Sequence, residues 1–173
     1  MTATDTSARD ALLAAVIDSI GRNGLGARSL RDLAADAGTS HRMLIHHFGS
    51  RDGLLVAIVT EVESRTAEVL QPLPTDPEGA VAAVWKNVSQ PELWPFERLF
   101  FECYARGAQG EEPFNRLIPA LVDSWLEGLR GRPRDQARLV LAVVRGLLLD
   151  VVATEERAAV ERAMKEFLAL LSR

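Results

Sequence analysis

Apolar residues recur along most of the chain at intervals of three and four residues, the spacing of an amphipathic helix. In the segment 8–20, Leu12, Val16 and Ile20 follow one another at four-residue steps. No stretch alternates apolar and polar residues strictly enough to predict a strand. The pattern therefore predicts an all-α protein.

Two short helices are predicted after a glycine-containing loop that ends near residue 28. Ser29 is placed to cap a helix over 30–37, and Gly38 ends it. Ser40 is placed to cap a second helix over 41–48, in which Leu44 and Phe48 face the same way. Short helices joined by a glycine-containing turn form a helix-turn-helix pattern.

The segment 72–79, PLPTDPEG, is the clearest break in the chain. A long helix over 51–70 precedes it, and the later helices are predicted over 80–88, 93–106, 117–129, 136–153 and 155–171. We expect two domains, a helix-turn-helix head over residues 1–50 and a helical body over residues 51–173.

Charge is distributed unevenly along this chain, whose net charge is −4. Between residues 22 and 51 there are five arginines and two aspartates, a local charge of +3. A basic head on an acidic body favours contact with phosphate. The single cysteine, Cys103, cannot form an intramolecular disulfide. With no basic leader and no apolar run long enough to span a bilayer, we expect a cytoplasmic protein with no membrane partner.

All three histidines, His41, His46 and His47, lie within seven residues of one another. Side chains meet on a helix at spacings of three or four, and these spacings are one, five and six. One helix therefore cannot aim two of them at one metal ion, and no catalytic motif accompanies them. We expect no metal, no cofactor and no enzymatic activity. A helical metal-dependent protein or enzyme that uses this cluster is the alternative, and a partner-binding helical module without an effector is a third.

A DNA-reading face fits the same segment better. Polar side chains and Ile45 lie on the side opposite Leu44 and Phe48, at the start of the second short helix, which suits a recognition helix in a major groove. Arg42 is suited to guanine N7 and O6. Ser29 and Arg51 stand at helix N-termini, where backbone N–H groups favour phosphate.

The segment SLRDLAADAGTSHRMLIHHFGSRDGLL resembles the DNA-binding head of the TetR family of transcriptional regulators. Residues 37–40 (AGTS) match the family's AGVS turn, and residues 44–48 (LIHHF) match its LYxHF ending. Two positions depart from the family pattern. Ile45 replaces the usual aromatic residue, and Arg42 replaces a small one, which would shift base preference.

The resemblance implies a repressor that leaves a palindromic DNA operator when a small apolar effector binds. It also implies that nine residues contact or approach the DNA, namely Arg28, Ser29, Ser40, His41, Arg42, Ile45, His46, His47 and Arg51.

In this family the C-terminal helices bind the effector and form a homodimer, and the residues permit both. The helix over 136–153 is apolar nearly all round, which favours burial on two sides. We expect a dimer interface of Leu139, Val143, Gly146, Leu147, Val160, Met164, Phe167 and Leu171. We expect an effector pocket of Trp85, Phe100, Cys103, Tyr104, Phe114, Trp125 and Arg145, although aromatic side chains also simply fill cores.

Overall fold

The computed structural model describes residues 3–26, 28–129 and 133–171, and these residues contain helices and no strand. The head consists of α1 (Ala3–Asn23), α2 (Leu30–Asp36) and α3 (His41–Phe48), and the long α4 (Arg51–Val69) leads away from it. The body adds α5 (Pro77–Val88), the short 3₁₀ helix η1 (Pro91–Leu93), α6 (Trp94–Ala108), α7 (Phe114–Gly128), α8 (Arg134–Thr154) and α9 (Arg157–Leu171). The all-α prediction is confirmed.

Serine caps set the boundaries of the three helices around the helix-turn-helix. The Ser29, Ser40 and Ser50 hydroxyls accept hydrogen bonds from backbone N–H groups in the first turns of α2, α3 and α4. Gly38 and Gly49 follow α2 and α3 with φ of 66° and 75°, a conformation that glycine adopts without a steric cost. The expected bounds of α3 are confirmed to the residue, and those of α2 and α4 to within one.

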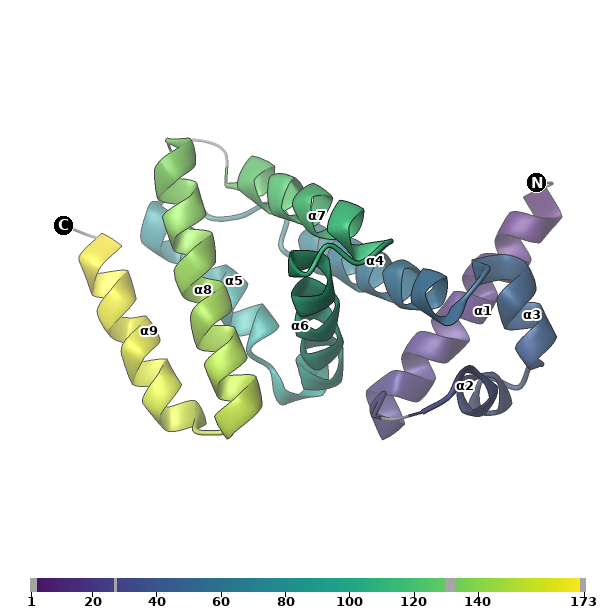
Figure 1. Ribbon diagram of the computed structural model, residues 1–173. Helices are drawn as coiled ribbons and strands as arrows, with labels where there is room; N and C mark the ends of the chain where they lie inside the picture. Colours follow the sequence, from purple (N-terminus) through teal and green to yellow (C-terminus); the bar gives the residue numbers. More distant parts are fainter. Residues whose placement is uncertain (1–2, 27, 130–132, 172–173) are drawn as a thin grey trace.

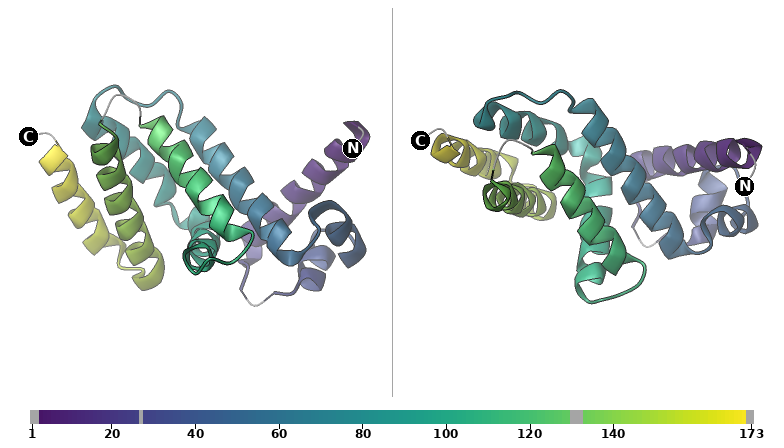
Figure 2. Two further views of the ribbon diagram at one scale, coloured as in Figure 1. Left: turned by 45° about the horizontal axis from the view of Figure 1, so that its top comes forward. Right: turned by 90° about the horizontal axis from the view of Figure 1, so that it is seen from above.

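The head lies at one end of an elongated molecule, and α8 and α9 lie at the other (Figures 1 and 2). Between them, α6 contacts α1 on one side and α8 on the other. The element that crosses the middle of the molecule therefore contacts both ends.

The buried apolar side chains form two clusters. The first core joins α1–α3 to α4, α6 and α7, and it includes Leu44, Leu55, Leu99, Cys103 and Phe114. The second core joins α5, α8 and α9, and it includes Trp85, Val144, Leu148, Val160 and Met164. The head therefore shares its core with the first helices of the body, so the expected division at residue 50 does not coincide with a gap in packing.

None of the described helices is both long enough and apolar enough to cross a membrane.

Candidate nucleic-acid interface and interior cavities

The recognition helix α3 buries one side and exposes the other. Leu44 is fully buried and Phe48 is 9% exposed, so these two side chains fasten α3 to the first core. His41, Arg42, Ile45 and His46 are exposed. The structure therefore leaves cationic and hydrogen-bonding groups free on the outer side of a helix at the end of the molecule (Figure 1).

The serines expected at the interface lie at helix starts. Ser29 and Asp32 form a reciprocal cap, in which the Ser29 backbone N–H donates to Asp32 at 2.8 Å. The hydrogen bond from the Ser29 hydroxyl lowers the pKa of Asp32. Ser40 caps α3 and is exposed, and Arg51 is the half-buried first residue of α4. Ser29, Ser40 and Arg51 thus stand at the starts of α2, α3 and α4, where phosphate contacts are favoured.

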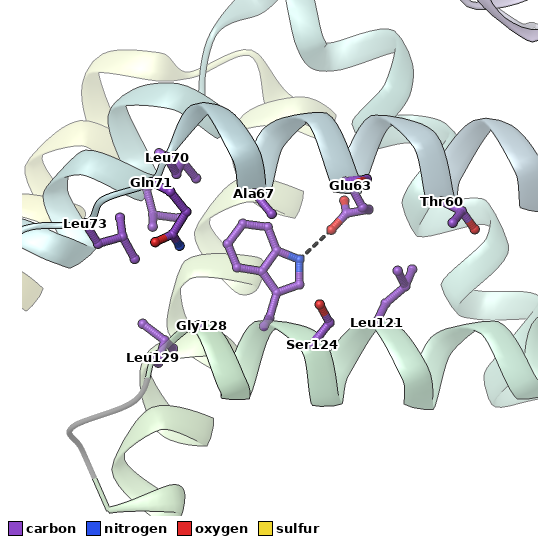
Figure 3. Close-up of a pocket in the computed structure, with 13 residues that line it drawn as sticks. Thr60, Glu63, Ala67, Leu70, Gln71, Leu73, Leu121, Ser124, Gly128 and Leu129 are labelled. Atoms are coloured by element: carbon purple, nitrogen blue, oxygen red, sulfur yellow. Dashed lines mark hydrogen bonds between the residues drawn. The ribbon is translucent and has the colours of Figure 1, made fainter. Parts of the chain in front are cut away.

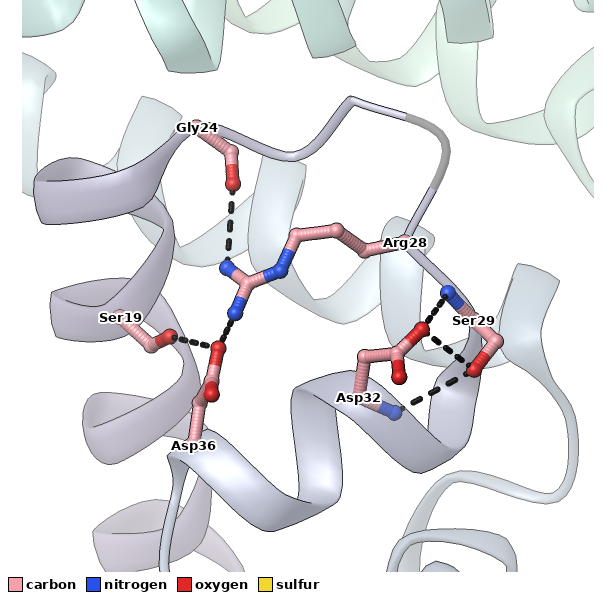
Figure 4. A network of polar contacts seen from close by, with 6 residues as sticks. All are labelled: Ser19, Gly24, Arg28, Ser29, Asp32 and Asp36. Carbon is pink, nitrogen blue, oxygen red and sulfur yellow. Dashed lines mark hydrogen bonds and ion pairs between the residues drawn. The ribbon is translucent and has the colours of Figure 1, made fainter.

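Arg28 is engaged inside the head (Figure 4). Its guanidinium donates to the Gly24 carbonyl at 3.2 Å and forms an ion pair with Asp36, which also accepts a hydrogen bond from Ser19 at 3.2 Å. This network holds the loop before α2 against α1. The expected DNA contact by Arg28 would require its guanidinium to leave these partners.

The three histidines do not converge on a common point. The His46 and His47 rings meet edge to face with centroids 4.9 Å apart, and His47 is half-buried beside Phe48. No group of three or more His, Cys, Asp or Glu side chains within the described ranges could hold a metal ion.

A cavity of about 240 Å³ lies between α4 and α7 (Figure 3). Its wall is largely apolar, with contributions from Ala67, Leu70 and Leu121. The Trp125 indole N–H donates a hydrogen bond to the Glu63 carboxylate across the cavity. We call this space the α4–α7 cavity.

A smaller cavity of about 40 Å³ lies where α4, α6 and α8 face one another. It shares Glu63, Val84 and Trp125 with the α4–α7 cavity, and Glu97, Phe100 and Arg145 complete its polar and aromatic wall. Burial raises the pKa of Glu63, and burial together with the nearby Glu63 raises the pKa of Glu97 to about 8. Burial lowers the pKa of Arg145. We call this space the inner cavity.

The structure distributes the expected pocket residues over several places. Phe100, Trp125 and Arg145 line the inner cavity. Tyr104 and Arg145 line a third, open cavity of about 340 Å³ beside α8. Trp85, Cys103 and Phe114 do not line these three cavities, because they are packed into the two cores.

Cys103 lies in the first core rather than beside a ligand. It is fully buried, and burial raises the pKa of its thiol to about 12, so the thiolate form is disfavoured.

Glu63 and Glu97 are the acidic cavity residues that the sequence analysis missed. A signal for Glu97 was present, since Trp94, Phe100 and Phe101 stand three or four positions from it and share its face of the helix. Glu63 gave no such signal, because its partner Trp125 is 62 positions away.

The residues expected at a dimer interface differ in exposure. Leu139 is 62% exposed and Gly146 is also exposed. Four others, Val143, Leu147, Phe167 and Leu171, are half-buried. Val160 and Met164 are each 2% exposed because they fill the second core of their own chain. Leu149, which was not expected, is 48% exposed on the same side of α8 as Gly146.

An ion-pair network ties α4 to α6 at the edge of the head. Arg106 near the end of α6 forms two hydrogen bonds with the Asp52 carboxylate, at 2.8 and 2.9 Å, and a third with Glu111 at 2.8 Å. The Arg106 guanidinium also stacks 4.2 Å from the Phe114 ring centroid. Its hydrogen bonds lower the pKa of Asp52. The start of α4 is therefore fixed to a helix that also lines the inner cavity.

The helix-turn-helix region and the fold both have known counterparts. Residues 12–58 match the family model of bacterial regulatory proteins, tetR family. Over its helix-turn-helix head the chain is therefore similar to this family, which supports a DNA-binding transcriptional regulator, as its motif indicates.

Individual relatives extend this similarity over nearly the whole chain. The HTH-type transcriptional regulatory protein RaaS of Mycobacterium tuberculosis is 27% identical over 96% of this chain and 82% of its own length. A transcriptional regulator from a Rhodococcus species has a TM-score of 0.77 at 22% identity, over 94% of this chain and 95% of that one. The multidrug binding protein EbrR, solved with imidazole, has a TM-score of 0.68 at 25% identity, over 95% of this chain and 89% of that one.

Proposed function

We propose that this protein is a homodimeric repressor that binds a two-fold DNA operator through α3 and releases it when an effector occupies its interior. The observation that carries the proposal is the position of α6. This helix lines the inner cavity with Glu97 and Phe100, contacts α1 of the head, and binds the start of α4 through Arg106.

Contacts with DNA bases are assigned to the exposed side of α3. Arg42 is suited to bidentate donation to a guanine, and His41 and His46 can donate to base acceptors or phosphates. Ser29, Ser40, His47 and Arg51 border this side and are assigned to the backbone, with Ile45 contributing an apolar contact. Arg28 is left out of this assignment because Asp36 and Gly24 hold its guanidinium.

Dimer formation is assigned to the exposed side of α8 together with α9. Leu139, Leu149 and Leu170 are large apolar side chains that are 48–62% exposed in the single chain. Gly146 has no atom within 4 Å of the place where a Cβ would stand, so a second helix has room to approach it closely. A two-fold dimer would set two α3 helices against successive major grooves.

Release from DNA follows if the effector favours a dimer state in which the two α3 helices no longer match the groove spacing. An occupied α4–α7 cavity would change the separation of α4 from α7. Because α4 begins at the head, tilting it would move α3. EbrR is described as a multidrug binding protein, which supports an effector role for the interior of this related fold.

The test is a gel shift with the region upstream of the protein's own gene, at several salt concentrations. We expect selective binding that weakens as salt rises. Arg42→Ala should cost about 1–3 kcal/mol on the preferred sequence and relax its selectivity. Arg51→Ala should weaken binding to all sequences alike and reduce the salt slope by about one. Binding that both changes leave intact would place the interface elsewhere.

A further inference from the structure

Glu97 is a buried acid whose charge the nearby Arg145 compensates only in part. Its side chain, on α6, belongs to a residue that is only 8% exposed, and no described residue forms a hydrogen bond or a close ion pair with it. The carboxyl group stands in the wall of the inner cavity. Burying a carboxylate without a compensating charge or donor is costly, so a group that supplies either one would be bound favourably at this position.

Glu63 extends the same acidic surface into the larger space. It lines both cavities, and its carboxylate accepts a hydrogen bond from Trp125. Among the residues around the α4–α7 cavity, Glu63 alone carries an ionisable side chain. The other polar groups there are the hydroxyls of Thr60, Ser64 and Ser124 and the amide of Gln71. The larger cavity therefore offers an acidic group and no basic group to a ligand.

Arg145 offsets the charge of these two acids only in part. Its guanidinium lies over the rings of Phe100 and Tyr104, with 5.3 and 5.5 Å to their centroids. It lines the inner cavity but not the α4–α7 cavity, and no ion pair within 4 Å joins it to another part of the described chain. Two acids and one guanidinium thus share the inner wall, and an anion in the larger cavity would meet only Glu63.

Because the proposed function assigns the effector to these cavities, we infer that the effector is an amphipathic organic cation. Its apolar body occupies the α4–α7 cavity beside Leu70, Leu121 and Trp125, and its positive charge lies against Glu63 and Glu97. A volume of about 240 Å³ holds a small aromatic or short alkyl body. The Trp125 indole adds a π surface that favours a cation.

Binding of a cation here is coupled to a proton. Glu97, with a pKa of about 8, is mostly protonated at neutral pH in the empty protein. A cation binds the ionised carboxylate more tightly, so it displaces this proton into solvent. The affinity for the cation therefore increases as the pH rises from 6 to 8.

The experiment is calorimetric titration of the full-length protein, without DNA, with phenyltrimethylammonium and with its neutral isostere tert-butylbenzene. The two molecules share a shape and differ in one charge. We expect the cation to bind at least about tenfold more tightly, and Glu97→Gln and Glu63→Gln each to lose about tenfold. Glu102→Gln, an exposed position on the same helix, is the matched control and should change nothing.

Equal affinity for the two isosteres, or cation binding that survives both glutamine substitutions, would overturn the inference. Tighter binding of benzoate than of the cation, lost in Arg145→Gln, would overturn it in favour of an anionic effector. The proposed function is tested separately by adding DNA. A cation that binds through both glutamates without releasing the operator supports the cation site and contradicts effector control.

Discussion

The two cores of this protein join different groups of helices. The first core fastens the head to α4, α6 and α7, so the α3 surface is carried by helices that belong to the body. The second core gathers α5, α8 and α9 at the far end, beneath the surface assigned to the partner chain. Glu63 on α4, Glu97 on α6 and Arg145 on α8 share one cavity wall where the two groups of helices meet.

This difference indicates where a bound ligand would most easily alter the arrangement of the helices. Closely packed apolar cores resist rearrangement, whereas incompletely paired buried charges are costly, so a ligand that pairs them is bound favourably. Under the proposed function, a ligand at the boundary between the cores would change the relative position of the cores without disrupting either. The head would then move as a unit with α4 and α6.

The largest effect is expected from a cavity made in either core. Leu55→Ala in the first core and Met164→Ala in the second should each lower the free energy of unfolding by about 2–5 kcal/mol, because both side chains are essentially fully buried. Urea denaturation measures this loss. Val69→Ala, at a position that is 72% exposed, is the control and should change stability by less than about 0.5 kcal/mol.

Hydrogen exchange measured on these two core variants tests whether the two cores unfold separately. Leu55→Ala should accelerate exchange mainly in α1–α3, and Met164→Ala mainly in α8 and α9. Identical exchange patterns for the two variants would mean that the molecule has a single cooperative core.

Much of the head was predictable from the sequence, since its signals are local. Ser29, Gly38, Ser40 and Gly49 act on neighbouring backbone, and Leu44 and Phe48 lie one helical turn apart. The prediction of which side of α3 faces the DNA therefore required only helical geometry.

The cavities were less predictable because they depend on contacts between distant segments. Glu63 meets Trp125 across 62 positions, and Asp52 meets Arg106 across 54. Helical periodicity cannot show which buried faces meet. Val160 and Met164 illustrate the same limit, because an apolar stripe fits a core and a dimer interface equally well.

A smaller, pH-dependent effect is expected at the boundary between the cores. The folded chain holds the Glu97 proton up to about pH 8, whereas the unfolded chain loses it near the ordinary value of 4.5. Because the folded state then binds more protons, this group makes the free energy of unfolding decline as the pH rises from about 4.5 to 8.

Glu97→Gln should remove that decline and raise Tm most at pH 8, by about 2–4 °C for each kcal/mol regained. Thermal unfolding of both proteins from pH 5 to 8 measures the difference. Some decline should remain, since burial also raises the pKa of Glu63, which lines the same cavity wall. A gain in Tm from Glu97→Gln that is constant with pH would show that Glu97 is ionised in the folded protein.

The most direct test is whether the cation lowers the affinity for the operator by the same factor by which the operator lowers the affinity for the cation. The operator affinity is measured by fluorescence anisotropy with and without saturating phenyltrimethylammonium, and the cation affinity by calorimetry with and without operator. Linkage requires the two factors to be equal, and we expect about 5- to 150-fold. Asp52→Asn, which weakens the α4–α6 tie, should reduce both factors together. An operator affinity that is unchanged when the cation site is full would contradict control of the head from the cavities.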